Sequence, residues 1–220
     1  MPSESNRDLL LDAAEVLFAE RGVGRVSMRS IQIAAGRSVG SIQYHFDDET
    51  DLLRQVLDRR ANPLSLQRLK ALRRLSKSAE PTTRKLVDIM LAPLVRSYSE
   101  MPERALLHVQ IIQRMQVDHL MKMFTSEIPV PEVQQLAFAL LCRIMPDIPP
   151  RTIVVRLGIT WETIVATVAR WQGSDQTDFT QFATILAEFL AGALEAPTSV
   201  VRPSPTNQQT VEALTQLMDK

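Results

Sequence analysis

A glycine-containing turn between two helix-forming segments is the feature that most constrains the fold of this 220-residue chain. The segment from Ser27 to Leu53 reads SMRSIQIAAGRSVGSIQYHFDDETDLL. Ser27 can cap a first short helix, and Gly36 can supply the positive φ that a tight turn needs. Ser38 can then cap a second helix over 39–45, and two aspartates can cap a third. The spacing therefore predicts a helix-turn-helix, whose second helix is the element that reads DNA in the major groove.

Apolar spacing around this turn predicts a small core. Ile42 and Phe46 lie four residues apart and face inward together, so Gln43, Tyr44 and His45 cannot all be buried. An ordinary three-helix bundle, in which Tyr44 and His45 merely cover the core, is the alternative interpretation. The upstream apolar positions recur at helical spacing and are Leu10, Ala13, Ala14, Leu17 and Phe18.

Composition agrees with an all-α protein. Equal numbers of basic and acidic residues, 25 of each, leave no global field to steer the chain onto nucleic acid or membrane. Seven glycines and frequent Leu and Ala favour helix over sheet. The lone Cys142 excludes an internal disulfide and indicates a reducing cytoplasm. Neither a signal peptide nor an uncharged apolar stretch of about 18 residues is found, so no membrane span is expected.

The residues around the turn resemble a known family. The run GRSVGSIQYHF from Gly36 to Phe46, preceded by LLDAAEVLFAERG and followed by an acidic cap and Leu52, is similar to the DNA-binding domain of TetR-type transcriptional regulators. The similarity covers about the first 55 residues, and the closing ILAEFLAGALEAP resembles a common ending of the family. The resemblance implies a homodimer that binds double-stranded operator DNA, usually as a repressor released by a small molecule.

Residue by residue, the resemblance also implies a DNA-binding face. Gly40 lets the backbone approach DNA closely, Gln43 can pair with adenine through two hydrogen bonds, and Tyr44 can contact a thymine methyl and a phosphate. The candidate DNA-binding residues are Ser27, Arg29, Arg37, Ser38, Val39, Gly40, Ser41, Gln43, Tyr44 and His45.

Some residues depart from the family pattern. Glu49 stands where the family commonly has a phosphate-binding Lys, Gln32 replaces a usual Ala, and Ile33 replaces a usual polar residue. Residues 1–60 hold eight Arg, no Lys and ten acidic residues, a net charge of minus two. A helical ligand-binding or interaction protein with weak or lost DNA binding is therefore the alternative function.

The chain divides into three predicted parts: a DNA-binding domain over 1–60, a helical effector-binding and dimerisation domain over 61–196, and a flexible tail over 197–220. The third helix is expected to end near Asn62-Pro63, where a new one starts. A basic run is expected on a solvated helix face, opposite an apolar face of leucines. The basic run is Arg68, Lys70, Arg73, Arg74 and Lys77, and the leucines are Leu66, Leu69, Leu72 and Leu75. Further helices are expected over 82–99, 102–125, 130–145, 150–172 and 177–195, with a possible short one over 210–218.

An apolar or amphipathic effector is expected among helices 82–145, because Pro93 should kink the first of them beside adaptable methionines. His108 and His119 are eleven residues apart without a partner at ligand spacing, so neither a metal nor a cofactor is predicted. No nucleophile elbow, phosphate loop or zinc signature is present, so an enzyme is not expected. The candidate pocket residues are Met90, Met115, His119, Phe124 and Phe138.

The last two helices are predicted to pair two protomers. The helix over 177–195 is apolar on two sides, one of which can pack within the protomer and the other against a partner. Two such helices from each chain would form a four-helix bundle across a two-fold axis. The alternative interpretation is a helix that is fully internal to the protomer. The candidate interface residues are Trp161, Val168, Ala183, Ala187, Ala191 and Leu194.

Overall fold

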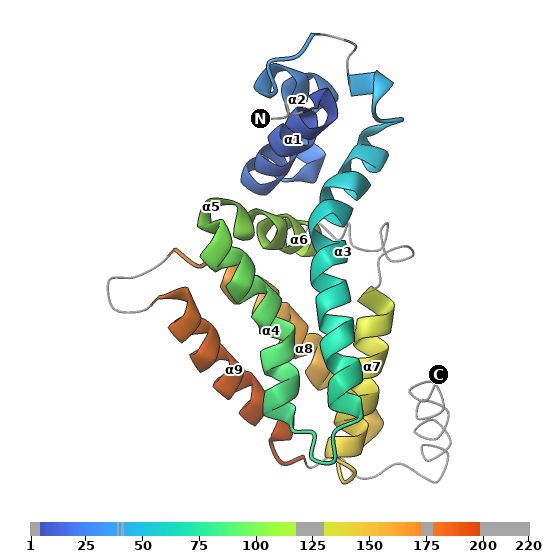
Figure 1. Cartoon of the computed structure of the whole chain (residues 1–220), viewed down its shortest axis with the longest axis vertical. Helices are drawn as coiled ribbons and strands as arrows, with labels where there is room; N and C mark the ends of the chain where they lie inside the picture. The colour runs from blue at the N-terminus through green and yellow to red at the C-terminus, as the bar shows by residue number, and fades with distance from the viewer. Residues whose placement is uncertain (1–4, 39, 41, 118–129, 173–177, 199–220) are drawn as a thin grey trace.

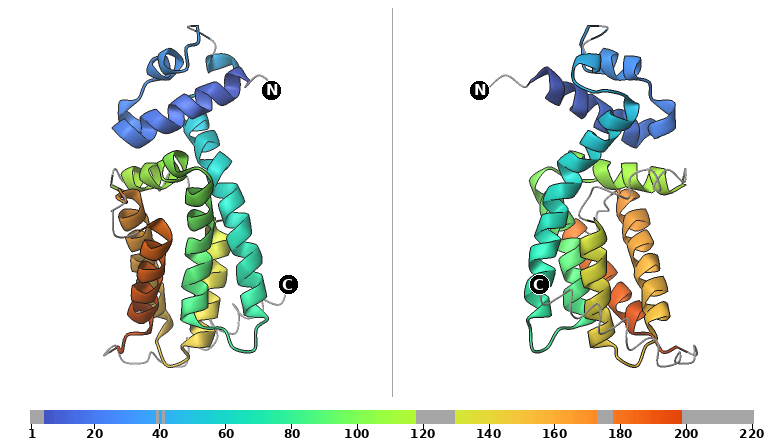
Figure 2. Two further views of the ribbon diagram at one scale, coloured as in Figure 1. Left: turned by 60° about the vertical axis from the view of Figure 1, so that its left-hand side comes forward. Right: turned by 90° about the vertical axis from the view of Figure 1, so that its right-hand side faces the viewer.

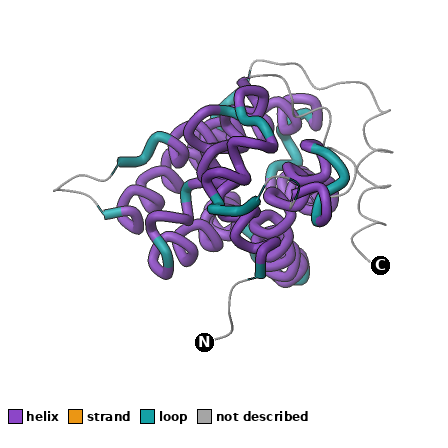
Figure 3. The backbone as a smooth tube through the Cα atoms, turned by 90° about the horizontal axis from the view of Figure 1, so that it is seen from above, coloured by secondary structure: helices purple, strands orange, loops and turns teal. Residues whose placement is uncertain are grey.

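The computed structural model describes residues 5–38, 40, 42–117, 130–172 and 178–198, and contains helices and no strand in this part of the chain. The predicted all-α class is confirmed. Figure 1 shows a small helical domain stacked on a longer bundle. Figure 3, seen from above, shows that loops join the helices without any sheet. The predicted helix over 210–218 lies outside the described residues.

The small domain is built from α1 (Asn6–Arg21), the 3₁₀ turn η1 (Val23–Arg25) and α2 (Met28–Ala34). The Ser5 hydroxyl caps α1 by accepting a hydrogen bond from the Asp8 amide, and α1 ends at Gly22 with φ +88°. The large side chains that fill its core are at most 1% exposed, and they include Leu10, Phe18, Ile31, Ile42, Phe46 and Leu52.

Helix α3 (Glu49–Ser76) joins the two domains as one continuous helix. The predicted helix end near Asn62-Pro63 is therefore wrong, and the predicted domain boundary at residue 60 falls inside α3. Pro63 removes only one backbone hydrogen bond, that to the Arg59 carbonyl. Buried residues on both sides of it hold the helix in each domain core, namely Leu52, Leu53, Val56 and Leu57 before it and Leu69, Leu72 and Leu75 after it.

The larger domain packs α3 with α4 (Thr83–Glu100), α7 (Val130–Ile144), α8 (Pro150–Ala169) and α9 (Phe179–Glu195). Four of the helices predicted beyond residue 80 are confirmed within a few residues, including Pro93 inside α4. The predicted helix over 102–125 is instead divided into α5 (Pro102–Ala105) and α6 (Leu107–Val117), and residues 118–125 lie outside the described part.

Helix α6 lies across the top of the bundle, directly beneath the small domain (Figure 2). Its Ile111 and Met115 are fully buried in the core of the small domain. Its Arg114 donates hydrogen bonds to the carbonyls of Ala19 (2.6 Å) and Glu20 (2.8 Å), at the end of α1. The two domains are thus joined by packing as well as by the chain.

Ion pairs reinforce this junction. Asp12 of α1 pairs with Arg59 of α3 (2.6 Å) and with Arg104 of α5 (2.8 Å), and the buried Glu15 pairs with Arg60 (3.0 Å). Partly buried pairs with several hydrogen bonds resist screening better than exposed ones.

The basic run on α3 is not a uniform solvated face. Lys70, Arg73, Arg74 and Lys77 are exposed as expected, but Arg68 is only 6% exposed, and Leu66 is exposed instead of buried. Because Arg68 lies within a turn of the buried Leu69 and Leu72, the helix turns its guanidinium into the bundle.

Helix α8 is long and apolar enough to cross a membrane by length and composition, a test that core helices also pass. Here it packs against α6, α7 and α9 in the bundle.

Acid should destabilise the fold through His108. Burial, reinforced by the charges of Arg68 and Arg60, lowers the pKa of His108 to about 3, whereas histidine in an unfolded chain titrates near about 6.5. Because the folded pKa is the lower one, the unfolded state binds the proton more tightly. Stability is therefore present above about pH 6.5 and is lost as the pH falls below it. Between pH 7.5 and 4.5 the loss from this residue should be on the order of 2–3 kcal/mol.

Urea unfolding of the parent chain and of His108→Leu at both pH values measures this loss. The variant should lose less stability than the parent by roughly that amount. Equal losses in the two proteins would contradict the assignment.

Candidate nucleic-acid interface

The turn after α2 is fixed by hydrogen bonds that include a buried side chain. Gly36 has φ +65°, as predicted, and its amide donates to the Ile33 carbonyl (3.1 Å). The Arg37 amide donates to the Gln32 carbonyl (2.9 Å). The Gln32 side chain, only 4% exposed, donates from Nε2 to the Ser38 carbonyl (3.2 Å). Sequence reasoning noted Gln32 only as a departure from the family, whereas it closes the turn.

The element after the turn is shorter than predicted. The structure has a 3₁₀ turn, η2 (Ile42–Tyr44), in place of an α-helix over 39–45, and Val39 and Ser41 lie outside the described residues. The amides of His45 and Phe46 both donate to the Ile42 carbonyl at 3.0 Å. Gly40 has φ +97°, a conformation that side-chain-bearing residues rarely adopt, and it precedes this turn closely.

Two buried residues anchor this segment and turn its remaining side chains outward. Ile42 and Phe46 are each 1% exposed, as predicted. Tyr44 between them is 88% exposed and Gln43 is also exposed. His45 is half-buried, with its ring edge-on to that of Tyr44 and the ring centroids 5.3 Å apart. The prediction that only part of this set covers the core is confirmed.

The other described candidate residues, one in α2 and three after it, are exposed or half-buried. Arg29, Ser38 and Gly40 are exposed, and Arg37 is half-buried. Ile33 is 70% exposed, an apolar side chain that sequence reasoning did not count among the candidates. Its signal was visible in the sequence, since an apolar residue replaces a usual polar one there.

Ser27 caps α2. Its hydroxyl accepts from the Ser30 amide (3.2 Å), while the Ser30 hydroxyl accepts from the Ser27 amide (3.1 Å), a reciprocal capping box. A phosphate contact from Ser27 stays a prediction.

The acidic residues at the start of α3 form a helix cap, an ion pair and a hydrogen bond within the protein. Asp48 caps the helix by accepting from the Asp51 amide (2.7 Å). Asp51 pairs with Arg54 (2.5 Å) and accepts from the Gln55 amide group (2.8 Å). Partial burial, and then the neighbouring charge of Asp48, raise the pKa of Glu49. Negative charge at this end also suits the helix dipole.

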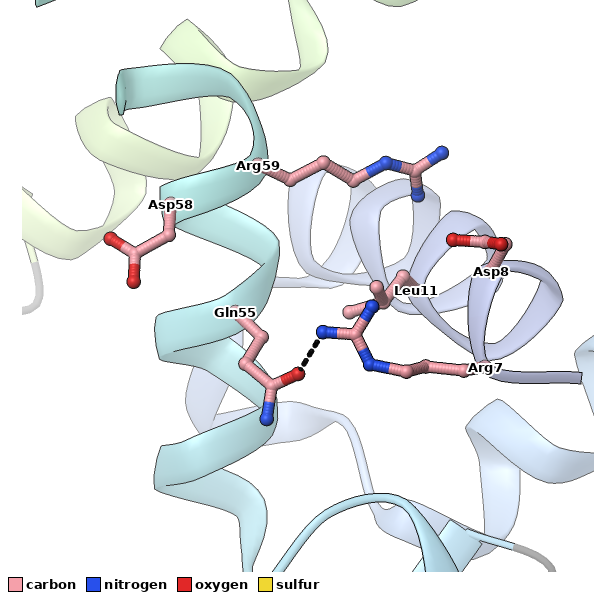
Figure 4. A pocket seen from close by; sticks show the side chains of 6 residues that line it. All are labelled: Arg7, Asp8, Leu11, Gln55, Asp58 and Arg59. Atoms are coloured by element: carbon pink, nitrogen blue, oxygen red, sulfur yellow. Dashed lines mark hydrogen bonds between the residues drawn. The ribbon is translucent and has the colours of Figure 1, made fainter. Parts of the chain in front are cut away.

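A polar surface hollow of about 370 Å³ lies between α1 and α3 (Figure 4). Arg7 crosses its mouth and donates to the Gln55 side chain at 2.5 Å. Two of its lining residues are basic and two acidic, so it favours no ligand of one sign. It is lined by Arg7, Asp8, Leu11, Gln55, Asp58 and Arg59.

The predicted effector residues do not form one site. Met90 of α4 lines a void of about 20 Å³, and Phe138 of α7 packs against the bundle core. Met115 lies in the small-domain core, because α6 passes beneath that domain, so its assignment to the pocket is wrong. His119 and Phe124 lie outside the described residues. A void of this size holds about one water molecule.

The predicted interface residues mostly face inward. Helix α9 packs on α4 and on α8, and Ala187, Ala191 and Leu194 of its small-residue stripe belong to the core of the larger domain. Trp161 is half-buried, and five of the six candidates are buried within one protomer, so their assignment to a partner-facing surface is wrong. The buried five are Val168, Ala183, Ala187, Ala191 and Leu194.

The apolar residues that α8 and α9 leave exposed are different ones. They are 54–66% exposed, and they are Val154, Val155 and Ile159 on α8 and Ile185 and Phe189 on α9.

Comparison with known proteins places the small domain in a family. The family model described as "Bacterial regulatory proteins, tetR family" matches residues 10–56, which run from α1 through the turn into α3. Over these residues the chain is similar to the DNA-binding domain of TetR-type regulators. The relatives that match these residues are regulators of transcription.

Two curated relatives illustrate this TetR-type match. The transcriptional regulator SrpR of Pseudomonas putida is 27% identical over 117 residues, which is 50% of this chain and 54% of SrpR. The transcriptional repressor KstR2 of Rhodococcus jostii is 43% identical over 51 residues, which is 23% of this chain and 25% of KstR2. The chain thus matches about half of the first relative and a quarter of the second.

A solved structure extends the likeness to both domains. SmeT, the repressor of the Stenotrophomonas maltophilia multidrug efflux pump SmeDEF, superposes with a TM-score of 0.55 at 19% identity, covering 92% of this chain and 98% of SmeT. The larger domain therefore shares the fold of SmeT.

The turn geometry predicts unequal costs for two glycine substitutions. A methyl group at Gly36 or at Gly24 meets nothing within 4 Å, so only the backbone conformation differs between them. Gly36→Ala must hold φ +65° and should lose about 1–2 kcal/mol of unfolding free energy. Gly24→Ala, without a left-handed φ, should be neutral or gain about 0.4–1 kcal/mol. Chemical denaturation measures both, and equal stability of the two variants would show that the turn does not hold Gly36 in this conformation.

Proposed function

We propose that this protein is a homodimeric DNA-binding transcriptional regulator of the cytoplasm, a repressor that a small apolar or amphipathic effector releases from its operator. The observation that carries the proposal is the exposed pair Gln43 and Tyr44, held between the buried Ile42 and Phe46 within the family-matched segment. An exposed aromatic side chain on a rigid base is suited to contact a base edge or a phosphate.

Exposed arginines near the turn, rather than the net charge of the domain, would attract DNA to this segment. Arg25 and Arg29 are exposed close to the turn, although residues 1–60 carry a net charge of minus two. The carboxylates of Asp48 and Asp51 are occupied by the α3 cap and by Arg54, which reduces their repulsion of phosphate.

Two neighbouring helices support a dimer. Val155 and Ile159 of α8 lie four residues apart, as do Ile185 and Phe189 of α9, so each helix presents an exposed apolar pair on one face. Helices α8 and α9 pack against each other. We assign the two-fold interface to these exposed residues, in place of the alanine stripe predicted from the sequence.

Helix α6 offers the route by which an effector would act on DNA binding. His108 near its start is buried, and Ile111 and Met115 further along are fixed in the core of the DNA-binding domain. A ligand that shifts α6 would tilt that domain and change the spacing of the two DNA-reading segments in the dimer.

Removing the exposed tyrosine should weaken operator binding. Tyr44→Ala loses about 1–3 kcal/mol at each half-site, and a dimer loses it twice, so binding should fall by about thirtyfold to more than ten-thousandfold. Gln43→Ala should relax the preference at one base pair per half-site. Titration against a duplex selected from a random pool and against its scrambled version measures both effects. Unchanged operator affinity of Tyr44→Ala would mean that another element enters the groove.

Arginine substitutions separate phosphate contacts from base contacts. Arg29→Ala should weaken binding to every sequence and flatten its salt dependence, while Glu49→Lys should tighten binding generally by adding a phosphate partner. The matched control is Arg96→Ala, which removes an exposed arginine on α4, outside the helix-turn-helix segment. It should leave both the affinity for DNA and its salt dependence unchanged. A salt slope that Arg29→Ala leaves unaltered would remove Arg29 from the interface.

Charge on the exposed face of α9 should dissociate the dimer. Phe189 is 66% exposed and Ile185 is 54% exposed in the protomer. Burying a large apolar side chain contributes about 1.5–3 kcal/mol, and each residue occurs twice across a two-fold axis. Phe189→Arg should therefore raise the dimer dissociation constant by at least about a hundredfold without unfolding the protomer.

Light scattering and circular dichroism measure assembly and folding together. Leu66→Arg replaces an equally exposed leucine of α3 and should stay dimeric. A parent chain that is monomeric at micromolar concentration would contradict the assignment of the dimer interface to α8 and α9.

A further inference from the structure

Arg68 is a buried positive charge without an acidic partner in the described part of the chain. Its side chain is 6% exposed. Its Nε donates to the Met90 carbonyl (2.9 Å), and its guanidinium carbon lies 5.8 Å from the centroid of the Trp161 ring. Among the described residues, no carboxylate lies within ion-pair distance of it.

Such a charge is costly, since an ion taken out of water needs pairing and full hydrogen bonding to recover its hydration energy. One carbonyl and one aromatic ring satisfy only part of a guanidinium that has five N–H donors. The remaining donors form a planar fork that matches the two oxygens of a carboxylate. An arginine kept in a bundle core under these conditions indicates an anionic partner.

The two residues that contact Arg68 also line an apolar void. Met90 and Trp161 border a space of about 20 Å³ between α4 and α8, in which Thr160 is the polar member. Leu86 and Val87 of α4 and Leu157 and Ile164 of α8 complete the lining. The lining is thus apolar next to the guanidinium, and methionine and leucine side chains can move to enlarge such a space.

A second buried polar group lies in the same electrostatic environment. His108 is 6% exposed and its Nδ1 has no hydrogen-bond partner. After burial, the charge of Arg68 is the largest influence that lowers its pKa. An anion beside Arg68 would offset that charge. Among the described residues, Arg68 is thus a buried charge without an ion-pair partner and His108 has a buried nitrogen without a hydrogen-bond partner. Ligand sites commonly use such convergent polar groups within an apolar lining.

We infer that the bundle interior between α4 and α8 binds an apolar monocarboxylate, with its carboxylate on Arg68 and its hydrocarbon body in the space bordered by Met90 and Trp161. The inference rests on the proposed function, because it names the chemical class of the effector. A single buried positive charge matches a monoanion, and a dianionic phosphate would leave a net negative charge in an apolar lining. Because the void is small, the ligand binds a conformation in which the side chains around it have moved apart. That conformation is rare without ligand, and binding increases its population.

Tryptophan fluorescence gives a direct readout. The chain has two tryptophans, Trp161 at the site and Trp171, which stacks on Phe182 (4.5 Å between ring centroids). In the Trp171→Phe chain, all tryptophan emission comes from beside Arg68. Octanoate and 1-octanol are the probes, since they share one hydrocarbon chain and differ in charge. Octanoate should change the emission saturably and bind about ten- to a hundredfold more tightly than octanol.

Substitutions at Arg68 test the pairing. In the same background, Arg68→Met should abolish the preference for octanoate and Arg68→Lys should retain part of it, while the exposed Arg96→Met should leave it intact. Replacing an unpaired buried charge by an apolar side chain of similar length should also keep or raise Tm. Equal binding of the two probes by the parent, or a preference that survives Arg68→Met, would overturn the inference. So would a fall in Tm above about 10 °C in Arg68→Met, because it would mean that Arg68 is already paired within the chain.

Measuring the operator affinity of the parent chain and of the Arg68 variants without octanoate separates this inference from the proposed function. No preference for octanoate with intact DNA binding would reject the carboxylate site alone. A clear preference with no DNA binding would support the site and reject the regulator. Release of DNA by octanoate in the parent, and not in Arg68→Met, would support both.

Discussion

The contact between α6 and the DNA-binding domain is the interaction on which the arrangement of the two domains depends. Ile111 and Met115 are fully buried in the small-domain core, and each such burial contributes about 1.5–3 kcal/mol. Arg114 adds hydrogen bonds to the last carbonyls of α1, where a positive charge also suits the helix dipole. Part of the small-domain core is thus supplied by α6 of the larger domain, which fixes the position of α6 against α1 and η1.

The continuous helix α3 is the second feature that holds the two domains in place. Pro63 removes one hydrogen bond, yet leucines anchored in both cores keep the helix unbroken across the boundary. The ion pair of Arg60 with the buried Glu15 lies on the small-domain side, and Arg68 lies two turns further into the bundle. Within the described residues, one helix therefore carries a buried ion pair and a buried arginine without an acidic partner, and this contrast is the basis of the inference about Arg68.

The sequence by itself determined the helical class and the layout of the small domain. The anchors Ile42 and Phe46, the glycine at the turn and the serine and aspartate caps are local features, governed by residue spacing and backbone freedom within a few residues. They were predictable because a helix cap or a left-handed turn depends little on distant parts of the chain. The outward orientation of Gln43 and Tyr44 followed from the same spacing, and the family match to residues 10–56 agrees with it.

Tertiary packing decided what periodicity left ambiguous. Helix α9 is apolar on two sides, and only its packing in the bundle, on α4 and α8, buries the alanine stripe and leaves Phe189 exposed. Met115 belongs to the small domain because α6 crosses beneath it, and Gln32 closes the turn because its side chain reaches the Ser38 carbonyl. Arg68 reads as one more residue of a solvated basic run until neighbouring helices enclose it. Sequence spacing specifies which side chains share a face, and only the assembled helices specify what that face meets.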